Sequence, residues 1–177
     1  MSTDKQKLGQ KIYQTAHLTG EFLLRSGTIS KQYFDKYRFE AQPILLRQIA
    51  EALEPLVPDD VDMLAGLEMG GIPIVTMLSQ ITGLPAVFVR KKAKEYGTCK
   101  LAEGNDIEGK TLLVVEDVVT SGGQVVLSTK DLRERGAIVT NAICVIDRES
   151  TGRANLAEIG VELAALFTMS ELVPASE

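Results

Sequence analysis

The chain has 177 residues, of which 45% are hydrophobic and 24% charged, a composition typical of one globular domain with a sizeable core. Its formal net charge of −5 argues against a general affinity for nucleic acid, and no apolar run is long enough to span a membrane. Two widely separated cysteines, and a polar start without the apolar core of a signal peptide, favour a reducing cytoplasm.

The first sixty residues show mainly helical periodicity. Apolar residues recur at helical spacing from Leu8 to Ala16, which predicts an amphipathic helix over about residues 4 to 19. The only histidine, His17, falls inside that range, where we expect a structural or surface role. Short extended pieces around a Ser-Gly turn follow. Between Pro43 and Pro58 a second helical face is expected, because proline suits a first helical turn.

From residue 61 onward the pattern alternates between short apolar runs and helical segments. Alternation with short glycine turns predicts an α/β fold, with a mainly parallel twisted sheet flanked by helices on both faces. Ligands of such sheets bind beyond the carboxyl ends of the strands, where this chain places its unusual polar residues. The expected strands are 61–67, 85–90, 111–117, 137–147 and 162–167, and the expected helices are 74–81 and 123–135.

The stretch VVEDVVTSGGQ, residues 114 to 124, places two acids before a Thr-Ser-Gly-Gly turn. Such a turn can be simple chain punctuation, with Thr120 or Ser121 as the helix N-cap. Its backbone amides and the helix N-terminus can also form a cradle for a phosphate. Glu116 and Asp117 suit that cradle only if the ligand also offers hydroxyl groups or a metal. A ribose phosphate offers both, so the stretch predicts a phosphoribosyl ligand.

This stretch resembles the phosphoribosyl diphosphate signature of type I phosphoribosyltransferases, and the strand–helix order resembles their fold. The resemblance covers about residues 5 to 170. It implies a single domain over 1–177, with a small N-terminal hood over 1–40 and a flexible catalytic loop, or lid, over 91–109. It also implies that phosphoribosyl diphosphate is bound by Glu116, Asp117, Val118, Val119, Thr120, Ser121, Gly122, Gly123 and Gln124.

A dense basic run, RKKAKEYGTCK, occupies residues 90 to 100 and is either a solvated surface loop or a lid. RKKAKEYG resembles the Arg-Lys-x-x-Lys-x-x-Gly loop of orotate phosphoribosyltransferases, which closes over the partner subunit's active site. The resemblance implies that Arg90, Lys91, Lys94 and Tyr96 contact phosphoribosyl diphosphate, and that Lys91 and Lys94 are catalytic. Many members carry a histidine where Tyr96 stands, which leaves the role of this phenol open.

Two further loops resemble parts of the diphosphate site. EMGGIP, residues 68 to 73, resembles the family's diphosphate-side loop, which implies contacts from Gly70 and Gly71. Many members carry a lysine where Gly70 stands, so backbone amides are expected to act there, with Arg90 or Lys91 compensating. Residues 20 to 34 resemble the N-terminal Phe-x-Leu-Lys-Ser-Gly segment, with Arg25 at the lysine position as a ligand of the sugar diphosphate.

The acceptor is indicated by the segment DRESTGR, residues 147 to 153, which resembles the family's Asp-Arg-x-x-x-Gly segment. The resemblance implies that Arg148 binds the orotate carboxylate, for which a guanidinium fork is well shaped. The alternative is an arginine that simply pairs with Asp147 or Glu149. The same resemblance adds Tyr33, Phe34 and Thr120 to the orotate site.

Taken together, the resemblance implies an orotate phosphoribosyltransferase that makes orotidine monophosphate and diphosphate in de novo pyrimidine (UMP) biosynthesis. It implies a Mg²⁺ cofactor held mainly by substrate and water, with Asp117 both catalytic and the candidate direct ligand. The expected assembly is a cytoplasmic homodimer that shares its lid across the interface and has no nucleic-acid or membrane partner. A purine or uracil phosphoribosyltransferase would share 116–124 without needing Arg148. A regulator that senses a nucleotide is disfavoured by the acidic charge.

Overall fold

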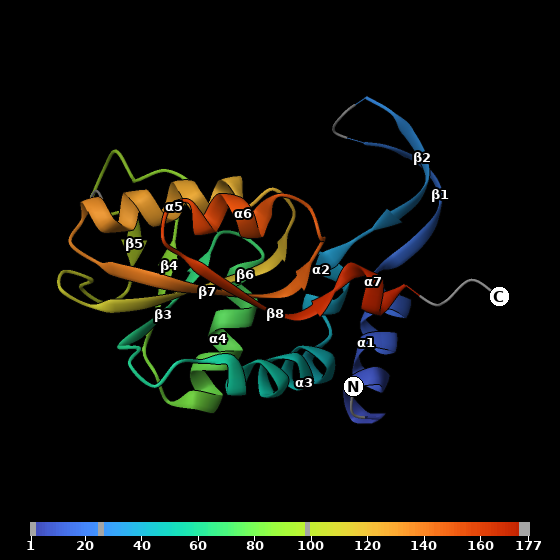
Figure 1. Cartoon of the computed structure of the whole chain (residues 1–177), viewed down its shortest axis with the longest axis horizontal. Helices are drawn as coiled ribbons and strands as arrows, with labels where there is room; N and C mark the ends of the chain where they lie inside the picture. The colour runs from blue at the N-terminus through green and yellow to red at the C-terminus, as the bar shows by residue number, and fades with distance from the viewer. Residues whose placement is uncertain (1–2, 25–26, 98–99, 174–177) are drawn as a thin grey trace.

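The computed structural model describes residues 3–24, 27–97 and 100–173. Its centre is a six-stranded sheet in the order β5-β4-β3-β6-β7-β8 (Figure 1). All neighbours are parallel except β5, which pairs antiparallel with β4 at the edge. The strands are β3 (Met63–Leu67), β4 (Ala86–Val89), β5 (Ala102–Glu103), β6 (Thr111–Val119), β7 (Ile138–Asp147) and β8 (Glu162–Thr168). The mainly parallel α/β fold predicted from the sequence is confirmed.

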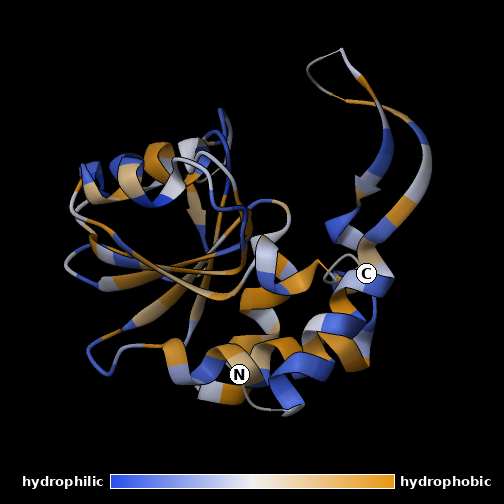
Figure 2. Cartoon of the chain, turned by 45° about the vertical axis from the view of Figure 1, so that its right-hand side comes forward, coloured by the Kyte–Doolittle hydropathy of each residue, from blue (hydrophilic) through white to orange (hydrophobic). Residues whose placement is uncertain are grey.

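Helices cover both faces of this sheet, as Figure 1 shows. On one face lie α3 (Pro43–Leu53), its 3-10 extension η1 (Glu54–Leu56) and α4 (Gly71–Thr82), and on the other lie α5 (Gly123–Glu134) and α6 (Gly152–Ala157). Each face has its own cluster of buried apolar side chains. Figure 2 shows hydrophobic residues along the sheet and on the helix sides that face it. β6 lies in the middle of the sheet, so its carboxyl end is flanked by β3 on one side and β7 on the other.

The N-terminal forty residues form a separate hood at one end of the sheet. Helix α1 (Thr3–Ala16) leads into an antiparallel hairpin of β1 (His17–Leu23) and β2 (Ile29–Phe34), which projects from the body in Figure 1. Helix α2 (Lys36–Glu40) then returns the chain toward the sheet. Its Phe39 is fully buried in the core that α1, α3 and the sheet share, which anchors the hood. A short C-terminal helix, α7 (Met169–Leu172), packs against α1.

Several boundaries differ from the prediction. Helix α1 ends at Ala16, so the prediction that His17 lies inside this helix is wrong, and His17 is the first residue of β1. Strand β6 continues past Asp117 to Val119, because Val118 and Val119 keep pairing with β7. The two acids therefore lie within the strand rather than at its end. The sequence patterns also missed α2, β5, α6 and α7, which span only two to six residues each.

Candidate active site

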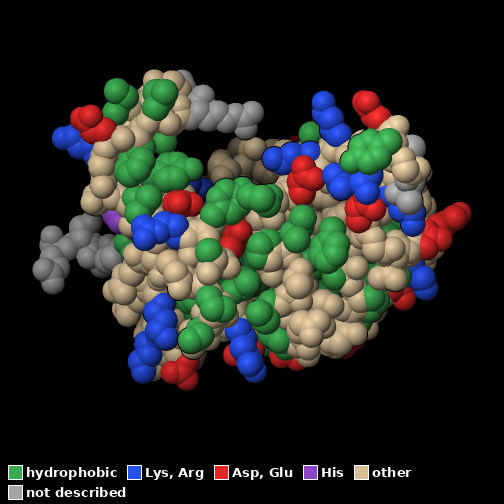
Figure 3. Space-filling view, turned by 180° about the vertical axis from the view of Figure 1, so that it is seen from behind, with side chains coloured by type: hydrophobic (Ala, Val, Ile, Leu, Met, Phe, Trp, Pro, Cys, Tyr) green, Lys and Arg blue, Asp and Glu red, His purple; other side chains and the backbone are tan. Residues whose placement is uncertain are grey.

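A polar cavity of about 360 Å³ lies at the carboxyl end of β6. Figure 3 shows a hollow between the hood hairpin and the body, with Lys and Arg side chains gathered on the rim opposite the hairpin. Segments from the hood, the loop after β3, the loop after β4 and the β6–α5 turn meet in this cavity. The lining residues are Lys36, Tyr37, Glu68, Met69, Lys91, Glu116, Val118, Val119, Thr120, Ser121, Gly122, Gly123, Gln124 and Val125.

The β6–α5 turn is held rigidly by its contacts with α6. The Gly152 N–H donates to the Thr120 carbonyl at 3.0 Å, and the Asn155 amide donates to the Ser121 carbonyl at 2.9 Å. Gly122 precedes α5 with a φ of 71°, a left-handed conformation that favours glycine. The first N–H groups of α5 have no carbonyl one turn earlier to bind. With its carbonyls engaged by α6, the turn has the backbone geometry of a phosphate cradle.

The two acids of β6 have different environments. The Asp117 side chain is fully buried, and its Oδ2 lies 2.6 Å from the Lys36 ammonium of α2. Its Oδ1 accepts a hydrogen bond from the Val118 N–H at 2.5 Å. Glu116 lines the cavity, but its Oε2 is buried and accepts no hydrogen bond from the described residues. One acid is therefore paired with a cation, while the other has an oxygen available for a ligand.

A third carboxyl group, that of Glu40 on α2, joins this cluster. Burial and the neighbouring charge of Asp117 raise the pKa of Glu40 to about 9. The same two causes raise the pKa of Glu116 well above its usual value. Burial alone would lower the pKa of the Lys36 ammonium, but the hydrogen bond and charge of Asp117 outweigh it and raise this pKa. The cluster thus favours the ion pair of Lys36 with Asp117, and the two other carboxyl groups are harder to ionise than ordinary glutamates.

Glu40 makes the stability of the protein depend on pH. Between the pKa of this carboxyl group in the unfolded chain and its raised pKa in the folded protein, the folded protein holds a proton that the unfolded chain has released. The free energy of unfolding should therefore fall as the pH rises from about 4.5 to about 9. Urea unfolding at pH 6 and pH 8 should show a smaller difference for Glu40→Gln than for the unaltered protein. Equal differences would contradict the assignment.

Loop 68–71 approaches β6 so closely that two of its positions have no room for a side chain. A Cβ on Gly70 would lie 1.6 Å from Asp117 Oδ2, and a Cβ on Gly71 would lie 2.3 Å from the Val115 carbonyl oxygen. Glycine at both positions is thus a steric requirement of this arrangement. The loop brings Glu68 and Met69 to the cavity wall, whereas Gly70 and Gly71 can offer only backbone groups.

The basic loop after β4 divides its cations between two places. Lys91 lines the cavity, and its predicted contact with the sugar diphosphate stays a prediction. Arg90 and Lys94 both contact Glu103 Oε1, at 3.0 and 2.5 Å, and these two cations lower the pKa of Glu103. Tyr96 is 75% exposed and lines neither this cavity nor the one that contains Arg148. The predicted contacts of Arg90, Lys94 and Tyr96 with substrate therefore stay predictions.

A second cavity of about 260 Å³ brings together the residues predicted for the acceptor. Tyr33, Phe34 and Arg148 line it, although they are far apart in the sequence. His17 and Tyr13 complete one wall, with their rings stacked at a centroid distance of 4.7 Å. Thr120, the fourth residue predicted for orotate, lines the first cavity instead. Arg25, predicted for the sugar diphosphate, lies outside the described residues.

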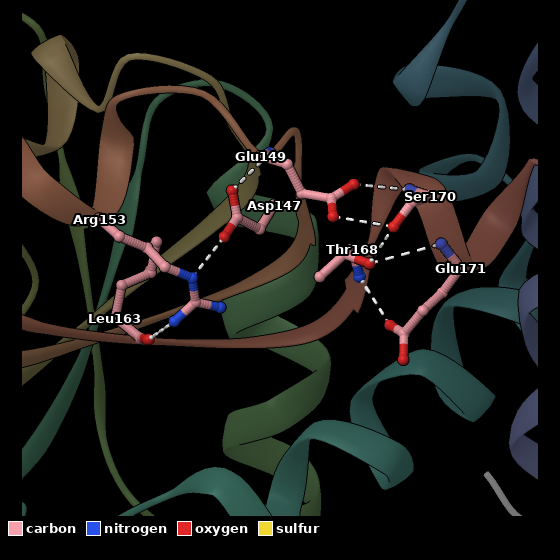
Figure 4. Close-up of polar contacts among 7 residues, drawn as sticks. All are labelled: Asp147, Glu149, Arg153, Leu163, Thr168, Ser170 and Glu171. Carbon is pink, nitrogen blue, oxygen red and sulfur yellow. Dashed lines mark hydrogen bonds and ion pairs between the residues drawn. The ribbon is translucent and has the colours of Figure 1, made fainter.

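The carboxylates on either side of Arg148 have other partners, as Figure 4 shows. Asp147 Oδ2 lies 2.6 Å from the Arg153 guanidinium, and Arg153 also donates to the Leu163 carbonyl. Glu149 accepts hydrogen bonds from the N–H and hydroxyl of Ser170, each at 2.8 Å. The pairing of Arg148 with Asp147 or Glu149, which the sequence left open, is not found. Arg148 is exposed, so its guanidinium is available to a ligand of the second cavity.

The donor set of the first cavity fits a magnesium ion that is bound mainly through substrate. Carboxylate oxygens such as those of Glu116 and Asp117 are suitable ligands for Mg²⁺. The buried, unpartnered Oε2 of Glu116 is the free oxygen closest in character to such a ligand. Among the described residues no group of three or more His, Cys, Asp or Glu side chains is arranged to hold a metal alone. Substrate oxygens would have to supply most of the coordination.

Sequence reasoning did not identify Lys36, Tyr37, Glu40, Glu68 or Met69. Only one feature pointed to α2, the spacing of Lys36 and Glu40, which puts both side chains on one face of a helix. A five-residue helix is too short to show a periodic pattern. The spacing of Lys36 and Glu40 was therefore not recognised next to the aromatic pair that precedes it. Glu68 and Met69 belong to a loop whose glycines drew attention to its backbone alone.

Comparison with known proteins places the chain in a class. The family model described as a phosphoribosyl transferase domain matches residues 37–159. That range contains the β6–α5 turn, the loop after β3 and the basic loop, which together line the first cavity. No helix among residues 3–24, 27–97 and 100–173 combines the length and the apolar character that crossing a bilayer requires. The fold and the cavity thus define a phosphoribosyltransferase.

Individual relatives narrow the class. A protein of a Nocardioides species named orotate phosphoribosyltransferase is 51% identical over 170 residues, which cover 96% of this chain and 95% of the relative. A Halobacterium salinarum protein of the same name is 45% identical, with 88% and 89% covered. The crystal structure of orotate phosphoribosyltransferase from Mycobacterium tuberculosis H37Rv is 26% identical with a TM-score of 0.86, covering 96% and 98%. The chain belongs to the orotate phosphoribosyltransferase family.

Proposed function

We propose that this chain transfers the phosphoribosyl group of phosphoribosyl diphosphate to orotate, which gives orotidine monophosphate and diphosphate. The observation that carries the proposal is the arrangement of the first cavity, where a phosphate cradle, Glu116 and Lys91 line one space of about 360 Å³, with the buried Asp117 next to Glu116 in β6. A phosphoribosyl group needs these three kinds of partner for its phosphate, its hydroxyls and its diphosphate. Arg148 in the neighbouring cavity then supplies the group that an orotate carboxylate requires.

The reaction is a displacement at the anomeric carbon, in which the bond to diphosphate breaks while a bond to the orotate nitrogen forms. Positive charge grows on the ribose ring, and negative charge grows on the departing diphosphate. Residues 120–124 would hold the 5-phosphate, which fixes the ring near the two acids of β6. Asp117 would then stabilise the ring charge, and Lys91 would stabilise the leaving group. Orotate provides its own nucleophilic nitrogen, so no covalent intermediate with the protein is required.

Magnesium and the assembly complete the proposal. Mg²⁺, held by substrate oxygens and by Glu116 or Asp117, would neutralise part of the diphosphate charge. The active form would be a cytoplasmic homodimer, in which the lid over 91–109 closes on the partner's cavity and excludes water. Arg90 and Lys94 pair with Glu103 and do not line the cavity, which supports an open form of the lid. These ion pairs must break before the two cations can reach the cavity in a closed lid.

The acceptor is tested by offering several bases to the same enzyme. The purified protein is incubated with phosphoribosyl diphosphate, Mg²⁺ and one of orotate, uracil, hypoxanthine, guanine or adenine, and nucleotide formation is followed by chromatography. We expect nucleotide from orotate alone. The fold cannot make this distinction, because an adenine phosphoribosyltransferase from Thermoanaerobacter pseudethanolicus matches it with a TM-score of 0.70. Product from a purine or from uracil, without product from orotate, would overturn the assignment.

Lys94 tests the lid. Replacing it with alanine should lower kcat about 100-fold, because a cation that stabilises the departing diphosphate is lost. The free energy of unfolding should change by less than about 0.5 kcal/mol, since the contact with Glu103 is partly exposed. Lys92→Ala is the matched control, because Lys92 is an exposed lysine of the same loop. A Lys94→Ala enzyme with the kcat of Lys92→Ala would contradict the proposal that Lys94 acts in a closing lid.

A further inference from the structure

The hood contributes a cation to the floor of the phosphoribosyl cavity. Lys36 belongs to α2, yet its ammonium lies 2.6 Å from Asp117 on β6 and its side chain lines the cavity. The lysine is 31% exposed, whereas the carboxylate is fully buried. An unpaired carboxylate at such depth would be costly, so this contact fixes where Asp117 points.

The steric limit at Gly70 explains why the cation comes from the hood. Asp117 Oδ2 occupies the space that a side chain at position 70 would need, because a Cβ there would lie 1.6 Å away. Position 70 of the loop before α4 can therefore supply no side-chain cation to this carboxylate. The ammonium of Lys36 from α2 contacts the same oxygen instead.

We propose that Lys36 is a positioning residue for phosphoribosyl transfer, which holds the buried Asp117 carboxylate beside the cavity and couples the hood to that cavity. This inference rests on the proposed function. It assigns to α2 a role in binding the sugar diphosphate, and none in binding the acceptor, because Lys36 does not line the cavity that contains Arg148.

Lys36→Met tests the role, because methionine keeps much of the length of the side chain and removes its charge. The KM for phosphoribosyl diphosphate should rise at least about tenfold, while the KM for orotate stays unchanged. Lys36→Arg keeps the charge and should recover most of the loss. Lys31→Met, the same change at an exposed lysine on β2, is the matched control and should behave as the unaltered enzyme.

A double-mutant cycle gives a readout that survives a loss of stability. Asp117→Asn removes the buried charge, so the double variant Lys36→Met, Asp117→Asn has no unpaired carboxylate at this position. Binding of phosphoribosyl diphosphate is measured by calorimetry for both single variants and the double variant. If Lys36 acts through Asp117, adding Lys36→Met to Asp117→Asn should weaken binding less than twofold.

The outcomes separate this inference from the proposed function. An unaltered enzyme that fails to use orotate would remove the proposed function. An active unaltered enzyme whose Lys36→Met variant matches Lys31→Met would remove the role of Lys36 alone. Equal rises in both KM values, or an undiminished effect of Lys36→Met in the Asp117→Asn background, would also overturn it.

Discussion

Asp117→Asn should lower kcat/KM about 100-fold to 1000-fold, the loss seen when one group that stabilises transition-state charge is removed. Asparagine keeps the size of the side chain and can still bind a hydroxyl group, so the change removes the charge alone. Asp117 is fully buried between the lining residues Glu116 and Val118 of β6, where a charge acts through little intervening water. Its loss is therefore felt most when positive charge grows on the ribose ring. Initial rates at varied phosphoribosyl diphosphate measure the effect.

The control for this variant is Asp60→Asn, which makes the same change at an exposed aspartate before β3. Its rates should equal those of the unaltered enzyme. Thermal unfolding of Asp117→Asn should show one cooperative transition, since Lys36 is partly exposed and can be hydrated when its partner is gone. A folded Asp117→Asn enzyme within threefold of the Asp60→Asn control would mean that Asp117 plays no part in the transfer.

Arg148→Ala should raise the KM for orotate about 10-fold to 150-fold and leave the KM for phosphoribosyl diphosphate unchanged. A hydrogen bond to a charged group contributes about 1.5 to 3 kcal/mol, and each 1.4 kcal/mol corresponds to a factor of ten. Arg148 is available for this contact because Arg153 and Ser170 engage the neighbouring carboxylates. Kinetics with one substrate varied at a time separate the two KM values.

Arg47→Ala is the control for Arg148, because Arg47 is an exposed arginine of α3 whose partner is Glu51 one helical turn away. A second comparison uses uracil, which lacks the carboxylate. The preference for orotate over uracil should shrink in Arg148→Ala and remain unaltered in Arg47→Ala. If Arg148→Ala and Arg47→Ala have the same KM for orotate, another residue of the second cavity must bind the carboxylate.

The larger elements of the fold could be predicted from sequence because each shows a pattern long enough to recognise. The β-branched run of β6 and the apolar spacing of α4 are examples, and Gly83 ends α4 in the left-handed conformation expected of a cap. Elements of six residues or fewer could not be found this way. Whether such a segment forms a helix is decided by its packing, as Phe39 of α2 illustrates by inserting into the core.

The candidate site likewise has a part that could be predicted from the sequence and a part that could not. The chain segment over 116–124 was identified because phosphate cradle and acids are contiguous in the sequence. The ion pair of Lys36 with Asp117 joins residues 81 positions apart, and no local pattern announces it. The same holds for the gathering of Tyr33, Phe34 and Arg148 in one cavity, which was implied by family resemblance and depends on how the hood packs against the end of β7.

The central claim is that the β6–α5 cavity transfers a phosphoribosyl group to orotate, and one absorbance measurement tests it most directly. The purified protein is mixed with orotate, phosphoribosyl diphosphate and Mg²⁺, and the ultraviolet absorbance of orotate is followed with time. We predict a loss that stops when either the sugar diphosphate or the metal is omitted, and that slows about 100-fold or more in Asp117→Asn. Unchanged orotate absorbance in the complete mixture would contradict the account.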